Sequence, residues 1–261
     1  MNKYKLFLLD MDGTIYLGDE VFKDTIPFLN YLKENNLNYV FMTNNSSKSQ
    51  AQYIEKLNRL NIPSTLENIY SSSMASASYL NEHYPKRRVF CLGNTALKTE
   101  LKKYNINIVD DNPDVILVGF DTELNYAELT KTTDYLTFND FPYIACNPDY
   151  VCPMENGRFI VDCGSICEAI EHATKKTPFF IGKPNPLMIY QLMEKYNVKK
   201  EEVLVVGDRI YTDIKSGINA GVDTCLVLSG ETTLDILNES KDKPTYVFND
   251  IGDLLNMLMQ Q

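Results

Sequence analysis

Two aspartates, Asp10 and Asp12, follow the apolar residues 6–9 and precede a glycine. The apolar run is typical of a buried strand, in which alternate side chains lie on the same side of the chain. Two carboxylates on one side repel each other unless a cation lies between them, and a bound divalent metal is the simplest such cation. Taken alone, the pattern also fits an ordinary strand that ends in an Asp-Gly turn. Its interpretation therefore depends on what the rest of the chain places beside it.

The two aspartates could hydrolyse a phosphate ester in two steps. Asp10 would attack phosphorus as a nucleophile and form an aspartyl-phosphate. Asp12 would protonate the departing alcohol and afterwards remove a proton from the attacking water. Because this acid and base role needs a free carboxyl group, we expect Asp12 to contribute to metal binding through its backbone carbonyl only.

A third aspartate, Asp208, also stands at the end of an apolar run, directly after Gly207. Mg²⁺ prefers a shell made only of oxygen ligands. Such a shell would form from the side chains of Asp10 and Asp208, the Asp12 carbonyl, a phosphate oxygen and waters. Asp213 could bind the same metal directly, or it could support one of the metal's ligands without binding the metal itself. The simpler alternatives are a strand-end turn for Asp208 and a helix N-terminal acid for Asp213.

A phosphate group bound here would also need a protein cation and fixed hydrogen-bond donors. Lys183 is the candidate cation because Gly182, Pro184 and Pro186 would fix the loop around it. The alternative is a solvated surface lysine. The Thr43 hydroxyl and the backbone amides of Asn44 and Asn45 are the candidate donors to the phosphoryl oxygens.

The order of the elements predicts an α/β fold with a doubly wound parallel sheet. Apolar strands alternate with helical periodicity, and ligands of such sheets bind at the carboxyl ends of the strands. The candidate residues at positions 10, 43, 44 and 208 all occupy predicted strand ends. Strands are expected at residues 5–10, 37–42, 68–72, 88–92, 114–118, 142–146, 158–161, 202–208 and 224–228, with a further strand starting at 179. Helices are expected at residues 24–35, 48–60, 95–104, 125–138, 165–175, 186–197, 213–220 and 251–258, and around Tyr79 and Leu80.

The middle of the chain keeps the α/β pattern but changes its spacing. Residues 85–178 could form their own small sheet covered by helices. We therefore expect two domains, a discontinuous core of residues 1–84 and 179–261 and an inserted domain of residues 85–178. Two apolar helix faces are interpreted as core: the stripe formed by Tyr53, Ile54, Leu57 and Leu60, and the apolar positions of the C-terminal helix.

Composition excludes several classes of function. The 35 acidic and 25 basic residues give a formal net charge of -10, which repels nucleic acid and anionic membrane surfaces. No apolar stretch approaches the roughly 20 residues of a membrane span, and the N-terminus lacks the apolar length of a signal peptide. The six cysteines form no C-x-x-C pair and are interpreted as reduced thiols. We expect a cytoplasmic protein with no membrane or nucleic acid partner.

Four segments together resemble a known family. They are Asp10-Met11-Asp12-Gly13-Thr14, Thr43-Asn44-Asn45-Ser46-Ser47, Gly182-Lys183-Pro184 and Gly207-Asp208-Arg209 followed by Asp213. In this order they are similar to the four motifs of the haloacid dehalogenase-like (HAD) hydrolases. The chain looks most like the NagD-like subgroup, class IIA, whose α/β cap lies between the second and third motifs. The likeness covers nearly the whole chain, and no motif position departs from the pattern.

The resemblance implies a role for each matching residue. Asp10 is the expected nucleophile and Asp12 the acid and base, with Thr43 and Lys183 holding phosphate. Asp208 is the expected Mg²⁺ ligand, supported by Asp213. An aspartate at position 12 favours a phosphatase, because the dehalogenase branch lacks this acid.

The resemblance also implies the substrate class and the role of the inserted domain. Family members of this kind hydrolyse small phosphate monoesters such as sugar or nucleotide phosphates. The cap is expected to close over the leaving group, and relatives often form homodimers through it. Residues 146–153 resemble the family's substrate-facing loop, although Asn147 could simply cap a turn and Asp149 could be solvated.

Two other functions use the same first chemical step. A signalling or binding module could accept phosphate on Asp10 without turnover, but a receiver domain of that kind needs only about half this length and no cap. A phosphotransferase or phosphomutase would pass the phosphoryl group to a sugar instead of water.

Overall fold

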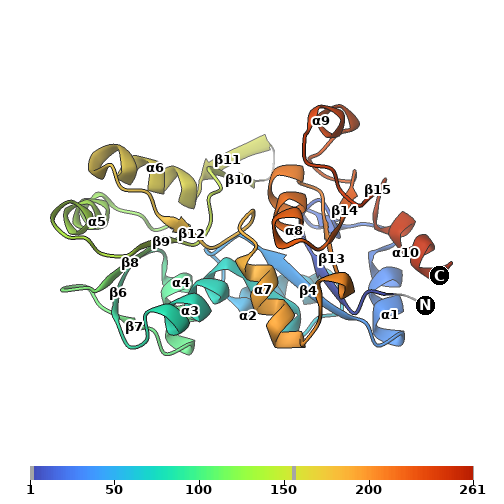
Figure 1. Ribbon diagram of the computed structural model, residues 1–261, viewed down its shortest axis with the longest axis horizontal. Helices are drawn as coiled ribbons and strands as arrows, with labels where there is room; N and C mark the ends of the chain where they lie inside the picture. Colours follow the sequence, from blue (N-terminus) through green and yellow to red (C-terminus); the bar gives the residue numbers. More distant parts are fainter. Residues whose placement is uncertain (1–2, 155–156, 261) are drawn as a thin grey trace. The chain divides into compact units, whose positions relative to one another are not determined.

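The structure of the protein is a computed structural model that describes residues 3–154 and 157–260. The chain folds into two compact units (Figure 1). Unit 1 comprises the described residues up to Thr43, Ala51–Tyr70 and the described residues from Lys183 onward. Unit 2 comprises Asn44–Gln50 and Ser71–Gly182. Two of the predicted motifs therefore lie at a unit boundary, one at Thr43 and one at Lys183.

Unit 1 is built on a six-stranded sheet in the order β15-β14-β13-β1-β4-β5. The strands are β1 (Leu6–Leu9), β4 (Asn38–Thr43), β5 (Ile69–Ser71), β13 (Val203–Gly207), β14 (Asp223–Val227) and β15 (Tyr246–Phe248). Strands β4, β1, β13, β14 and β15 run parallel. The chain moves outward from β1 to β5 in one direction and from β13 to β15 in the other. The order therefore reverses between β1 and β13, which is where doubly wound sheets bind their ligands.

Helices and short elements connect these strands. The helices of unit 1 are α1 (Thr25–Glu34), α2 (Gln50–Arg59), α7 (Leu187–Tyr196), α8 (Lys215–Ala220), α9 (Leu234–Glu239) and α10 (Ile251–Met259). A π-helical turn, η4 (Ile210–Ile214), leads directly into α8. The remaining elements are a small hairpin, β2 (Tyr16–Leu17) with β3 (Glu20–Val21), and the 3₁₀ turns η1 (Leu66–Asn68) and η3 (Lys200–Glu202).

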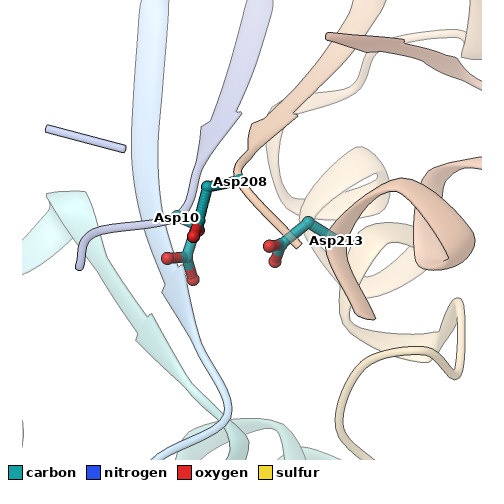
Figure 2. A group of neighbouring side chains, drawn as sticks. All are labelled: Asp10, Asp208 and Asp213. Atoms are coloured by element: carbon teal, nitrogen blue, oxygen red, sulfur yellow. The ribbon is translucent and has the colours of Figure 1, made fainter. Parts of the chain in front are cut away.

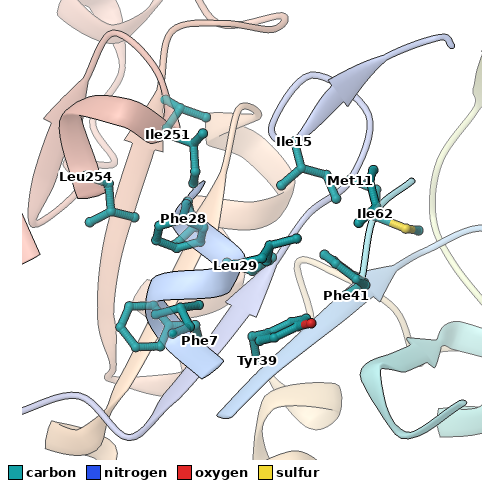
Figure 3. Close-up of a cluster of buried hydrophobic side chains, with 14 of the residues drawn as sticks. Phe7, Met11, Ile15, Phe28, Leu29, Tyr39, Phe41, Ile62, Ile251 and Leu254 are labelled. Carbon is teal, nitrogen blue, oxygen red and sulfur yellow. The ribbon is translucent and has the colours of Figure 1, made fainter. Parts of the chain in front are cut away.

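The two faces of the unit 1 sheet bury alternate residues of each strand. On one face Phe7 of β1 and Phe41 of β4 pack with the buried residues of α1 and α10 (Figure 3). The rings of Phe7 and Phe28 meet edge to face with centroids 6.2 Å apart. On the other face, Gly217 of α8 lies so close to Thr224 of β14 that a Cβ would overlap the threonine side chain. Helices therefore cover both faces, as a doubly wound sheet requires.

Unit 2 has its own sheet and core. Its five strands lie in the order β12-β9-β8-β6-β7, all parallel. They are β6 (Arg88–Leu92), β7 (Asn107–Ile108), β8 (Val115–Val118), β9 (Tyr143–Ala145) and β12 (Phe179–Phe180), and an antiparallel hairpin joins β10 (Val151–Met154) to β11 (Arg158–Val161). The helices are α3 (Ser72–His83), α4 (Thr95–Lys103), α5 (Tyr126–Phe138) and α6 (Cys163–Thr174). Phe90, Ile116 and Ile170 belong to a second hydrophobic cluster, separate from that of unit 1.

The predicted fold class is confirmed, and the predicted long elements lie within a few residues of their positions. The stripe at Tyr53 and Leu57 is core, as is the apolar face of α10. The helix predicted at 213–220 is partly wrong, because its first two residues belong to the π-helical turn. The prediction also lacked β2, β3, β7, β10, α9 and the edge strand β15, which are two to six residues long and show no complete period.

The predicted insertion at 85–178 lies wholly within unit 2. That unit also contains Asn44–Gln50, the helix α3 and the strand β12 with the two residues after it. Within the described chain, no helix combines the length and apolar character needed to cross a membrane.

Candidate active site

Three aspartates meet at the point where the order of the unit 1 sheet reverses. Asp10 follows β1 and Asp208 follows β13, and these strands are parallel neighbours with Leu9 opposite Val206. Asp213 lies in the π-helical turn and directs its carboxylate toward the other two (Figure 2). One carboxylate oxygen of each aspartate lies within 4.8 Å of those of the other two. The topology thus gathers acids that are about two hundred residues apart in the chain.

Lys183 is buried between two of these carboxylates. Its Nζ donates to Asp10 Oδ1 at 2.7 Å, to Asp213 Oδ1 at 2.6 Å and to the backbone oxygen of Met42 at 3.1 Å. These three bonds use the three N–H donors of an ammonium group. The residue is only 3% exposed, so the alternative of a solvated surface lysine is wrong.

The packing of acids and lysine shifts their protonation. Burial, together with the charges of Asp10 and Asp213, raises the pKa of Asp208 to about 7. Burial also raises the pKa of Asp213 to about 6, although the Lys183 charge opposes this. For Lys183, burial by itself lowers the pKa, but the charges of Asp10 and Asp213 outweigh it and the pKa is raised. The lysine therefore stays protonated, and because its single charge cannot balance three carboxylates, the pKa of Asp208 is raised by the charges of its acidic neighbours as well as by burial.

The residues fit a hard divalent cation. Asp208 Oδ2 accepts from the backbone N–H of Glu231 at 2.7 Å, whereas Asp208 Oδ1 is buried with no hydrogen-bond partner in the described chain. Asp213 differs, because its Oδ1 accepts from Lys183 and its Oδ2 accepts from the Arg209 N–H at 3.1 Å. Oxygen-only donor sets of this kind suit Mg²⁺, Ca²⁺ or Mn²⁺ and not the softer transition metals.

Asp12 lies outside this buried cluster. Its side chain is 55% exposed, and its Oδ2 is 3.9 Å from the ammonium of Lys56 on α2. The same ammonium lies 4.1 Å from the ring centroid of Tyr16. Burial is the largest influence on the pKa of Asp12 and raises it; the Lys56 charge lowers it and the Asp10 charge raises it. Asp12 is thus a carboxyl group accessible to solvent beside the cluster.

The predicted phosphate-binding residues begin at the end of β4. Thr43 is the last residue of that strand and follows Met42, whose carbonyl accepts from Lys183. Asn44 and Asn45 belong to unit 2. The Asn44 side chain donates to Asp149 Oδ2 at 3.0 Å, and the Asn45 Oδ1 accepts from the backbone N–H and the hydroxyl of Ser47 at 2.8 Å each. The proposed role of the two asparagine amides stays a prediction.

The loop that resembles a substrate-facing loop is held by a buried network within unit 2. Asn147 is fully buried and donates to Asp149 Oδ2 at 3.1 Å and to Asp162 Oδ1 at 3.2 Å. Asp149 therefore accepts from two asparagines and is not the solvated side chain of the simpler alternative. Asp162 caps α6 by accepting from Cys163.

No sequence pattern pointed to Lys56 or to the loop after β14, Ser229–Thr232, which contacts Asp208. Nothing in the sequence around Lys56 indicates a functional role, because a lysine between buried Tyr53 and Leu57 of a helix normally faces solvent. The loop offers only a Ser-Gly pair after a strand, which is typical of any turn.

Comparison with known proteins identifies the family of this chain. The haloacid dehalogenase-like hydrolase family matches residues 7–107, and a second HAD-like hydrolase family matches residues 180–254. The chain is 35% identical over 256 residues to an acid sugar phosphatase of Staphylococcus aureus, covering 98% of each protein. The chain belongs to the haloacid dehalogenase-like hydrolases.

Solved structures place this HAD hydrolase among the NagD-like phosphatases of class IIA. A 4-nitrophenylphosphatase from Thermotoga maritima superposes with a TM-score of 0.93 at 41% identity, covering 97% of each chain. NagD from Escherichia coli K-12 superposes with a TM-score of 0.89 at 29% identity, covering 97% of this chain and 98% of its own. The HAD protein described here is accordingly a phosphatase, a hydrolase of phosphate monoesters.

Proposed function

We propose that this HAD phosphatase hydrolyses small phosphate monoesters, such as sugar or nucleotide phosphates, with Mg²⁺ and through an aspartyl-phosphate on Asp10. The observation that carries the proposal is the group formed by partly exposed Asp10 with buried Asp208 and Asp213, in which Lys183 pairs with Asp10 and Asp213. The names of the relatives, an acid sugar phosphatase and 4-nitrophenylphosphatases, support small esters as substrates.

Asp10 is the proposed nucleophile because it is the acid of the cluster whose side chain is partly exposed, at 18%. Its oxygen would form a bond to phosphorus as the bond between phosphorus and the leaving oxygen breaks. Lys183 orients this carboxylate through its 2.7 Å hydrogen bond and offsets negative charge on the transferred group.

Asp12 is the proposed acid and base. It would give its proton to the departing alcohol and then take one from the water that attacks the aspartyl-phosphate. Its exposed carboxyl group has access to both molecules, and its raised pKa favours the protonated form that the first step needs.

The carboxylates of Asp10 and Asp208 and the backbone carbonyl of Asp12 would hold Mg²⁺. When bound, the ion would neutralise charge on the phosphoryl oxygens. Asp208 offers a free oxygen for this purpose, whereas both oxygens of Asp213 already accept hydrogen bonds. We therefore assign Asp213 the role of holding Lys183 and the Arg209 backbone in place.

Four further assignments belong to the proposal. The Thr43 hydroxyl and the amides of Asn44 and Asn45 would hold the phosphoryl oxygens, and the cap of residues 85–178 would select the leaving group. The enzyme would act in the cytoplasm, which the six free cysteines support. It would form a homodimer through the cap.

The decisive experiment measures phosphate release from p-nitrophenyl phosphate by the wild-type protein and by Asp10→Asn. We expect Mg²⁺-dependent turnover in the wild type and a loss of at least about a thousandfold in Asp10→Asn. Asp19→Asn is the matched control, because Asp19 is an exposed acid of the same region that pairs with Arg59.

The same experiment separates the alternatives. Phosphate that stays on Asp10 without turnover would favour an accepting module, and transfer to an added sugar would favour a phosphotransferase. A metabolite phosphate library would then identify the preferred ester.

A further inference from the structure

The loop Ser229–Thr232 lies beside the acids without belonging to any of the four motifs. It follows β14, whose residue Leu226 pairs with Gly207 in the parallel neighbour β13. Because the two strands end at the same edge of the sheet, the loop leaves the sheet next to Asp208. Each of its four residues contacts either Asp208 or Gly13, which follows Asp12.

The loop fixes the backbone and one carboxylate oxygen of Asp208. The Glu231 N–H donates to Asp208 Oδ2 at 2.7 Å, and the Thr232 N–H donates to the Asp208 carbonyl at 3.2 Å. The Thr232 hydroxyl accepts from the Ile210 N–H at 3.2 Å. With Oδ2 held, the rotation of the carboxylate is restricted and Oδ1 stays available to a cation.

Gly230 and Gly13 leave room for the same carboxylate. A Cβ at either glycine would overlap the Asp208 side chain. Any larger residue at position 230 must therefore turn Asp208 away from its present orientation. At Gly230 the crowding involves the Cβ and Cγ of Asp208 as well as its carboxylate oxygen, so a small movement at the far end of that side chain does not relieve it.

Ser229 connects the loop to the turn that carries Asp12. Its hydroxyl donates to the carbonyl oxygen of Gly13 at 2.8 Å. Gly13 has a positive φ of 89° and directly follows Asp12, so this bond anchors a turn that few residues can form. One loop thus contacts both the predicted metal ligand and the turn of the predicted acid and base.

We propose that the Ser229–Thr232 loop is a positioning element for the phosphatase reaction, in which Gly230 and the Glu231 amide orient Asp208 for the metal and Ser229 holds the Asp12-Gly13 turn. The inference rests on the proposed function for the roles of Asp208 and Asp12. It assigns different consequences to two neighbouring residues of the loop: Gly230 governs metal affinity, and Ser229 governs turnover.

The Gly230 arm of the test measures Mg²⁺ binding by calorimetry without substrate. Gly230→Ala should raise the Mg²⁺ dissociation constant about 10-fold to 100-fold, because losing a group that orients a metal ligand weakens metal binding by about this factor. Gly217→Ala is the matched control, because its Cβ would also be crowded, against the Thr224 side chain, but would not contact Asp208. Circular dichroism verifies the fold of both variants.

The Ser229 arm measures kcat and KM at saturating Mg²⁺. Ser229→Ala should lower kcat about tenfold with KM and Mg²⁺ affinity nearly unchanged, and Ser229→Thr, which keeps the hydroxyl, should restore kcat. Ser64→Ala is the control, because Ser64 also donates to a backbone carbonyl, that of Ile62 at 3.3 Å, outside this site.

Two results would overturn the inference: Mg²⁺ affinity in Gly230→Ala equal to that of Gly217→Ala, or kcat in Ser229→Ala equal to that of Ser64→Ala. An inactive wild-type enzyme would instead reject the proposed function. The calorimetric comparison of Gly230→Ala with Gly217→Ala would still decide whether the loop orients Asp208.

Discussion

Lys183 and Asp10 are 173 residues apart in the chain, yet the lysine Nζ lies 2.7 Å from the Asp10 carboxylate. The same ammonium also donates a hydrogen bond to Asp213, so one buried cation pairs with two carboxylates. In a low-dielectric site, ion pairs of this kind hold the lysine and the two carboxylates in a fixed geometry. Removing the lysine would leave buried carboxylate charge without compensation.

Replacing Lys183 should therefore affect both activity and stability. Lys183→Met should lower kcat at least a hundredfold or so, as loss of a fixed donor to developing charge does, and should cost about 3 kcal/mol of unfolding free energy without Mg²⁺. Urea unfolding and steady-state kinetics measure the two effects. Lys5→Met is the control, since Lys5 pairs with Glu202 at the surface and its loss should cost under about 1 kcal/mol. Equal stability losses in the two variants would contradict the prediction.

Asp208 should make the metal-free protein sensitive to pH. Its folded pKa of about 7 lies above the ordinary value, so the folded state binds the proton more tightly than the unfolded state does. Its contribution to stability is therefore fully present below about pH 4 and is lost as the pH rises through 7. With a chelator present, Asp208→Asn should be more stable than the wild type above pH 7, by roughly 4 kcal/mol.

Urea unfolding between pH 5.5 and 8.5 tests this expectation. The stability difference between Asp208→Asn and wild type should shrink as the pH falls through about 7. A stability difference that does not vary with pH would show that the Asp208 carboxyl group does not titrate within this pH range. Asp19→Asn, at an exposed position, should show no such trend.

Lys56 should influence the pH profile of turnover through Asp12. Burial raises the pKa of Asp12 and the Lys56 charge opposes it, so Lys56→Met should raise this pKa further. The whole profile of kcat against pH should then move to higher pH, by up to about one unit because the pair is partly exposed. Lys56→Arg keeps the charge and should leave the profile in place. Superimposable profiles for wild type and Lys56→Met would exclude this influence.

Asp149 should stabilise unit 2 through its two asparagine donors. Asp149→Ala leaves Asn44 and Asn147 without this acceptor and should cost about 1–3 kcal/mol in chemical unfolding. Asp149→Asn retains an acceptor oxygen and should lose less. The control is Asp140→Ala, at a fully exposed position where the carboxylate lies 3.3 Å from the Lys176 ammonium. If Asp149→Ala unfolds like Asp140→Ala, the network contributes nothing measurable.

The sequence was sufficient for the repeating elements and the motif residues. Strands β1 and β13 could be predicted because each is a short apolar run that ends in polar residues, and helices α1, α5 and α7 because they are long enough to show their period. Short edge elements such as β15 and β7 escaped prediction, because two or three residues carry no periodicity and their pairing depends on neighbours distant in sequence.

By itself, the sequence determined the residue types available for chemistry and an order of strands that brings Asp10 and Asp208 to one sheet edge. Only the tertiary structure decided how those groups interact: Lys183 is buried against two acids, Asp208 keeps one oxygen without a partner in the described chain, and Ser229 reaches the Gly13 carbonyl. The physical reason is that hydrogen bonding and desolvation depend on distances of a few ångströms between segments far apart in the chain. Neither composition nor local periodicity specifies those distances.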